Sequence, residues 1–151
     1  MLKITSALLL CIGVSLAHAG DRLKTYQVSI TNLTPGQAFT PQLVFTHRHS
    51  KPLFTLGETA SSELEQLAEG GDTAPLTALV ADYANDYTTN PVLLMPGETT
   101  ALTIKGKPGN GLLTVVAMLL PTNDTFVALD GMKLPHQGSV SYLVPAYDAG
   151  S

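Results

Sequence analysis

Cysteine and tryptophan are almost absent from this chain, which has one cysteine and no tryptophan in 151 residues. Because that cysteine, Cys11, lies near the N-terminus, the rest of the chain cannot form an internal disulfide and must be stabilised by packing or by a bound metal. There is also no cysteine nucleophile there, no G-x-S-x-G segment and no tryptophan platform for sugars. These absences predict a non-enzymatic protein.

Charged residues are few and mostly acidic. The chain has 8 Lys and Arg against 12 Asp and Glu, a formal net charge of −4, and no run of basic residues. A net negative chain without a basic run is not attracted to phosphate-rich surfaces. The sequence therefore predicts that neither nucleic acid nor anionic lipid is a direct electrostatic partner.

The longest apolar run lies at the N-terminus. Lys3 precedes an apolar stretch over residues 4–16, and Ala17-His18-Ala19 fits a signal peptidase site. Residues 1–19 are therefore predicted to be a signal peptide, with the mature chain beginning near Gly20. No later run is long enough for a transmembrane helix. Leu10 stands where a lipidation site at Cys11 would need a small residue. The predicted location is secreted or periplasmic.

Alternating apolar and polar residues, bounded by turn residues, predict a chain rich in β-strands. Residues 112–120 are apolar on both faces, which predicts a central strand covered by two layers. Asp130-Gly131 is a favoured hairpin pair and is predicted to be a turn. The strands are predicted over residues 25–32, 42–47, 92–95, 99–105, 112–120, 126–129 and 139–144, with the β pattern returning only after residues 85–91.

Helical spacing appears only between the second and third predicted strands. Ser62 and Glu65 form a capping box for a helix that ends at Gly70-Gly71. A second helix is predicted over residues 74–83, with Thr73 as its N-cap. Residues 20–151 are thus predicted to form one domain, an antiparallel β-sandwich of about eight strands with a short helical insertion.

Two aspartates stand at chain positions that suggest a metal site. Asp124 follows the apolar run over residues 112–120, and Asp148 lies in a second short loop, Tyr147-Asp148-Ala149-Gly150. If sheet pairing brings them together they repel and lose hydration, and Ca²⁺, which prefers carboxylate and carbonyl oxygens, removes both penalties. Alternatively, each aspartate stabilises a turn by accepting a backbone N–H bond two residues on.

Histidines suggest a competing metal site. His47 and His49 are two apart, so in a strand both lie on one face, where imidazoles bind Zn²⁺ or Cu²⁺, and His136 could complete the set. This would make the protein a periplasmic transition-metal-binding protein. Alternatively, residues 46–51 form a polar loop in which the histidines are solvated.

Four segments, taken in order, resemble the spondin N-terminal domain family, most closely its stand-alone bacterial secreted members. They are YQVSITNLT (26–34), HSK (49–51) leading into ASSELEQLAEG (60–70), PTNDTFV (121–127) and PAYDAG (145–150). The resemblance implies an eight-stranded antiparallel β-sandwich that binds one Ca²⁺, and it implies no enzymatic activity.

The same resemblance implies which residues hold the ion. It assigns calcium ligands to Asp124 and Asp148 and a third acidic ligand four residues after Asp148, one residue beyond Ser151. We therefore expect the sequence to be a fragment truncated at its C-terminus. The family also implies a binding or adhesion-type module with an unknown extracellular or cell-surface ligand.

Overall fold

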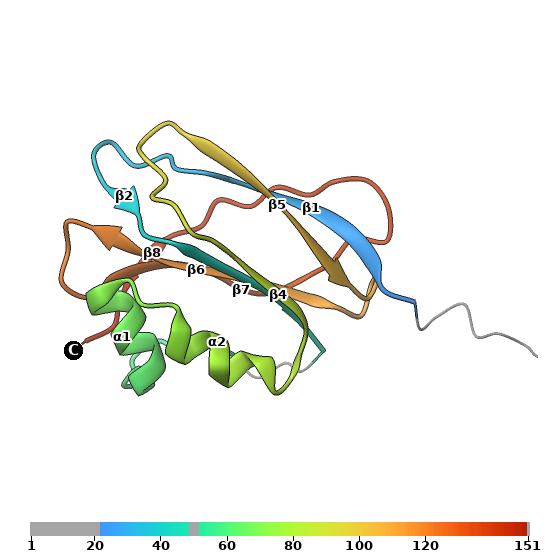
Figure 1. The fold of residues 1–151 in the computed structure, drawn as a ribbon, viewed down its shortest axis with the longest axis horizontal. Coiled ribbons are helices and arrows are strands. Elements are labelled where there is room, and N and C mark those ends of the chain that lie inside the picture. Colours follow the sequence, from blue (N-terminus) through green and yellow to red (C-terminus); the bar gives the residue numbers. More distant parts are fainter. Residues whose placement is uncertain (1–21, 49–51, 151) are drawn as a thin grey trace, which may run out of the picture.

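Two antiparallel sheets form the core of the molecule (Figure 1). The computed structural model describes residues 22–48 and 52–150, and this part contains eight strands and two short helices. The predicted mainly β, antiparallel sandwich is confirmed. The strands are β1 (Lys24–Thr31), β2 (Ala38–Phe39), β3 (Gln42–His47), β4 (Ala84–Asn90), β5 (Thr99–Gly106), β6 (Leu112–Leu120), β7 (Thr125–Lys133) and β8 (Ala146–Asp148).

Strand β6 is the centre of the larger sheet, whose order is β4-β3-β6-β7-β8 with β2 also paired to β6. Its residues alternate between the two faces, and both faces are covered. Val116 and Met118 pack in the cluster beneath the helices, whereas Val115 packs against Ile104 of β5 in the smaller β1-β5 sheet. This arrangement confirms the prediction that residues 112–120 form a central strand covered by two layers.

The helices α1 (Ser62–Gly70) and α2 (Ala74–Ala81) lie together on one face of the larger sheet (Figure 1). Ser61, one residue before the predicted capping box, is the N-cap, and its side chain accepts a bond from the Leu64 N–H. Thr73 holds the N-cap position of α2 without a side-chain bond, while Asp72 Oδ1 accepts from the Ala74 N–H at 2.9 Å. Helix α2 ends at Ala81, earlier than predicted.

A bulge in β7 replaces the predicted hairpin turn at Asp130-Gly131. The pairing of β6 with β7 shifts between Leu113 and Val115, so Asp130 and Gly131 together face Thr114. Gly131 has φ 65°, a left-handed conformation that glycine adopts without strain. The prediction of a turn was wrong because an Asp-Gly pair suits a bulge as well as a hairpin. β7 continues to Lys133, beyond the predicted end at residue 129.

The Thr114 hydroxyl is the centre of a buried polar network at this bulge. It lies 3.0 Å from His47 Nε2, donates to Asp130 Oδ1 at 3.2 Å, and accepts from the Gly131 N–H at 3.0 Å. Asp130 Oδ2 accepts from the Leu53 N–H at 2.7 Å, which fixes the segment before α1 on the sheet. One hydroxyl therefore links β3, β6 and β7.

Three further strand predictions were wrong. Residues 84–90 form β4, where no strand was predicted, and residues 92–95 contribute only one isolated bridge, from Leu94 to Phe39. Residues 139–144 form no strand and are exposed, with Leu143 87% accessible, whereas the final strand is β8. In each case the segment forms a strand only where a neighbouring strand pairs with it, and the sequence pattern does not show whether such a partner is present.

Candidate metal centre

Sheet pairing brings the two predicted metal-ligating aspartates together. The chain leaves β6 through a cis peptide bond between Leu120 and Pro121 and returns as β7 immediately after Asp124. Strand β8 pairs antiparallel with the start of β7, with Asp148 opposite Thr125, and the Ala149 N–H donates to the Asp124 carbonyl at 2.9 Å. The register therefore sets Asp148 beside Asp124, although 24 residues separate them in the chain.

The two carboxyl groups interact directly. The pKa of Asp124 is raised above the ordinary value of 3.8, first by desolvation of its half-buried side chain, then by the negative charge of Asp148 and a side-chain hydrogen bond with it. The charge of Glu69 raises it further, and a backbone hydrogen bond opposes these effects. No described basic side chain is among the causes of this shift.

Asp148 is held in a defined orientation by its own turn. Its Oδ1 accepts from the Gly150 N–H at 2.8 Å, and Gly150 has φ 73°. This is the turn bond that the sequence allowed as an alternative to metal ligation, and it fixes the carboxylate without burying it. The side chain remains exposed to solvent. The turn and a role in ion binding are therefore compatible.

Glu69, in the last turn of α1, is a third acidic residue in the electrostatic environment of Asp124. Sequence reasoning missed it, because its approach depends on how α1 packs on the sheet. Within residues 22–48 and 52–150, no group of three or more His, Cys, Asp or Glu side chains is placed to hold a metal ion. Asp124 and Asp148 alone do not make such a group, and an ion held between them would need other oxygens as its remaining ligands.

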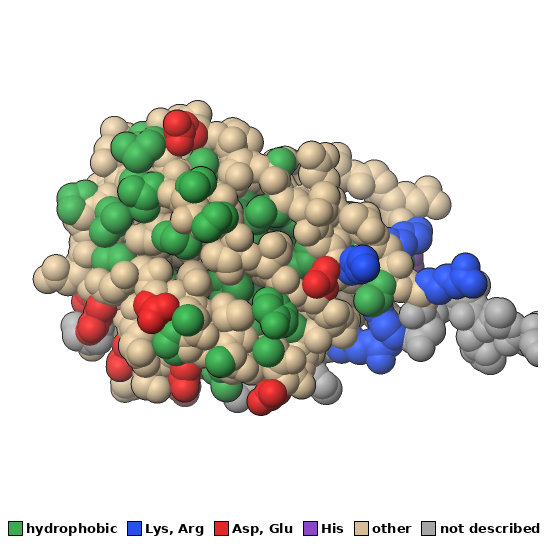
Figure 2. All heavy atoms as spheres, in the orientation of Figure 1, with side chains coloured by type: hydrophobic (Ala, Val, Ile, Leu, Met, Phe, Trp, Pro, Cys, Tyr) green, Lys and Arg blue, Asp and Glu red, His purple; other side chains and the backbone are tan. Residues whose placement is uncertain are grey.

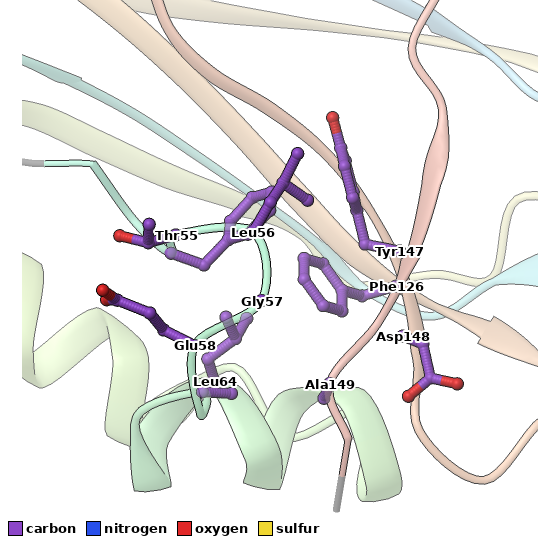
Figure 3. Close-up of a pocket in the computed structure, with 11 residues that line it drawn as sticks. Thr55, Leu56, Gly57, Glu58, Leu64, Phe126, Tyr147, Asp148 and Ala149 are labelled. Atoms are coloured by element: carbon purple, nitrogen blue, oxygen red, sulfur yellow. The ribbon is translucent and has the colours of Figure 1, made fainter.

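A shallow cavity of about 90 Å³ lies beside β8, and Asp148 of the carboxyl pair is one of the residues that line it. Phe54, Phe126 and Tyr147 form its aromatic wall, with ring centroids 4.6 to 5.7 Å apart. In Figure 3 the Asp148 carboxylate points away from this cavity and from Leu56. Asp148 thus contributes to the edge of the cavity, while its carboxylate is directed outside it.

The alternative histidine site is not assembled by the described residues. His47 is 2% exposed, and its ring packs edge-on against Tyr83 while Nε2 bonds to Thr114. His136 lies in the segment after β7, with its ring against Gly109. His49 lies outside the described residues. His47 is thus a buried member of the polar network and does not lie on a solvated face.

The raised pKa of Asp124 predicts how the metal-free protein responds to pH. A carboxyl whose pKa is raised by folding stabilises the folded state while it is protonated, and that contribution is lost as the pH rises through its folded value. We expect wild type in EDTA to lose stability relative to Asp124→Asn as the pH rises from below 3.8 towards neutrality. Melting temperatures of both proteins across about pH 3 to 7 check this. A difference that stays constant with pH would contradict it.

Fold and site together define an antiparallel β-sandwich domain with an acidic pair where two loops meet at one end. Residues 24–151 match the family model described as Spondin_N. Since the match covers most of the chain, the protein belongs to the spondin N-terminal domain family. This confirms the resemblance found in the sequence, and the domain is of an extracellular type. No curated protein matches the sequence.

Neither helix in the described part of the chain, which leaves out the predicted signal peptide, is long and apolar enough to cross a membrane. Helix α1 has nine residues and α2 has eight.

Proposed function

We propose that this protein is an exported, non-enzymatic spondin-type module that binds one Ca²⁺ between Asp124 and Asp148. The ion joins the loop after β6 to the end of β8. The ion links the two segments as disulfides do in other secreted domains. The module itself binds a ligand outside the inner membrane. The protein works in the periplasm or beyond the cell.

The observation that carries the proposal is the pairing of β8 with the start of β7. The pairing brings two carboxyl groups together, and the pKa of Asp124 is raised first by desolvation and then by the charge of Asp148. A divalent cation converts this repulsion into attraction on both sides, and oxygen ligands on loops suit Ca²⁺ in particular. The exposure of Asp148 leaves the pair accessible from solvent.

The chemistry of the pair also narrows the choice of ion. Both groups are hard oxygen donors, and neither cysteine nor histidine is part of the pair. Transition metals favour nitrogen and sulfur ligands, whereas Ca²⁺ accepts six to eight oxygens in flexible geometry. Backbone carbonyls and water would complete the coordination.

Isothermal titration calorimetry with CaCl₂ tests the proposal. We expect one Ca²⁺ per chain for wild type and binding weakened on the order of a hundredfold in Asp148→Asn, since carboxylate charge sets the affinity of calcium sites. Asp82→Asn is the matched control, because Asp82 is an exposed acid at the C-cap of α2 and its loss alters the net charge equally. Equal weakening in both variants would sink the proposal.

A further inference from the structure

Basic side chains gather at the end of the sandwich opposite the acidic pair. In the described part of the chain they come from β1 and the residues before it, the residue after β3, β5, the loop after β5 and the end of β7; they are Arg22, Lys24, Arg48, Lys105, Lys107 and Lys133. Figure 2 shows blue side chains at the right-hand end of the molecule and most of the red ones elsewhere. We call this surface the basic end.

Strand register places these residues together. Lys24 lies opposite Gly106, so it neighbours Lys105 and the following loop. Lys133 lies opposite Leu112, which also pairs with His47, the residue before Arg48. A bond of 2.6 Å from Thr46 Oγ1 to the Lys105 carbonyl joins the two sheets at this end. The five contributing segments therefore form one surface.

Most of this charge is not neutralised within the described structure. Between residues 22–48 and 52–150, no carboxylate lies within ion-pair distance of Arg22, Lys24, Lys105 or Lys133, and all four are exposed. Asp86 is the nearest acid in the register. Its Oδ2 accepts from the Lys105 backbone N–H at 2.7 Å and its Oδ1 from the Tyr87 N–H. Asp86 therefore forms no ion pair with these four side chains, but it adds one negative charge beside Lys105.

The acidic end is too far away to offset this charge. Strand β6 runs from the basic end at Leu112 to the acidic pair beyond Leu120, nine residues that span about 30 Å at roughly 3.3 Å each. The Debye length at physiological salt is about 8 Å, so the two ends act independently on a partner. Although the net charge is −4, basic and acidic side chains are concentrated at opposite ends of the molecule.

We propose that the basic end binds anionic polysaccharide. Separate exposed cations on a rigid sheet end suit a chain of regularly spaced sulfate, phosphate or carboxylate groups, whose condensed counterions are released on binding. An extracellular-type domain meets such polymers at cell surfaces and in the material around cells. This function does not depend on the proposed calcium site.

Nucleic acid is the less suitable polyanion. Proteins that bind single strands stack bases on exposed aromatic rings beside the basic groups. The exposed large aromatics in the described structure are Tyr87 and Tyr142. Tyr87 follows Asp86, which bonds to the Lys105 backbone, so one exposed ring lies near the basic end. Several cations beside a single exposed ring match a sugar polymer better than a nucleic acid strand, whose successive bases stack on several rings.

Binding of immobilised dextran sulfate in EDTA at about 50 mM salt tests the proposal. We expect Lys24→Gln/Lys105→Gln/Lys133→Gln to bind about 100-fold more weakly than wild type, at roughly fivefold per cation near an anionic surface. We also expect a shallower dependence of affinity on salt. The control Thr59→Glu/Gln66→Glu/Thr78→Glu changes the net charge equally at exposed sites away from the basic end and should bind like wild type.

Three results would overturn the proposal: no binding by wild type, equal weakening of the triple variant and its control, or tighter binding of a single-stranded oligonucleotide than of dextran sulfate. Circular dichroism confirms that each variant is folded. Because EDTA removes Ca²⁺, failure here leaves the calcium proposal standing, and the reverse also holds.

Discussion

Saturating Ca²⁺ is expected to raise the melting temperature of the wild-type protein by about 10 °C and to leave that of Asp124→Asn almost unchanged. A ligand present at 100 times its Kd stabilises the state that binds it by about 2.7 kcal/mol. In a domain of this size each kcal/mol shifts the melting temperature by roughly 4 °C. Asp124→Asn removes one of the two carboxylates and therefore the basis of the stabilisation.

The same variant makes a second, opposite prediction in EDTA. Without metal, desolvation and then the charge of Asp148 raise the pKa of Asp124, and an asparagine of similar shape removes the cost of ionising this group. At neutral pH Asp124→Asn should therefore melt at or above the wild-type temperature in EDTA and below it in Ca²⁺. This reversal of order distinguishes a metal ligand from a residue that only supports the fold. An aspartate needed only for its turn would lower the melting temperature equally in both buffers.

The second large effect is expected for Thr114→Val, which should lower the free energy of unfolding by about 3 kcal/mol. Valine keeps the shape of threonine, but it leaves His47 Nε2, Asp130 Oδ1 and the Gly131 N–H without the hydroxyl that each now contacts. Thr114 is fully buried, so water does not replace the lost bonds, and each unsatisfied buried group costs about 1 kcal/mol or more.

Denaturant unfolding at neutral pH measures this effect, with two controls. Thr103→Val makes the same change at an exposed position of β5 and should alter stability by less than about 0.5 kcal/mol. Thr114→Ser keeps the hydroxyl and should lose far less than the valine variant. If serine and valine cost the same, the methyl group and not the hydrogen-bond network stabilises this site.

The central part of the fold could be predicted from the sequence because its signals are local. Nine consecutive apolar residues define β6, and the segments of β1, β3 and β5 carry their own alternation or apolar runs. Strand β4 could not be predicted, since its sequence, ANDYTTN, is polar and its strand form comes from pairing with β3. The segment over residues 139–144 has a strand-like sequence and no described partner, and it stays irregular.

In the candidate site, too, single residues could be recognised from the sequence, whereas their arrangement in space could not. Asp124 was recognisable because a carboxylate directly follows a buried strand, and Asp148 because the family resemblance marks it. Their proximity depends on the register of β7 with β8, and the influence of Glu69 depends on the packing of α1. The basic end was hidden for the same reason, because its residues come from separate segments that only the sheets bring together.

The position of a bound ion tests the central claim most directly. We expect crystals of the protein grown with Ca²⁺ to show one ion with a side-chain oxygen of Asp124 and one of Asp148 each at about 2.3 to 2.6 Å from it. An ion bound elsewhere, or side-chain oxygens of these two residues held about 6 Å or more apart in the presence of Ca²⁺, would contradict the account.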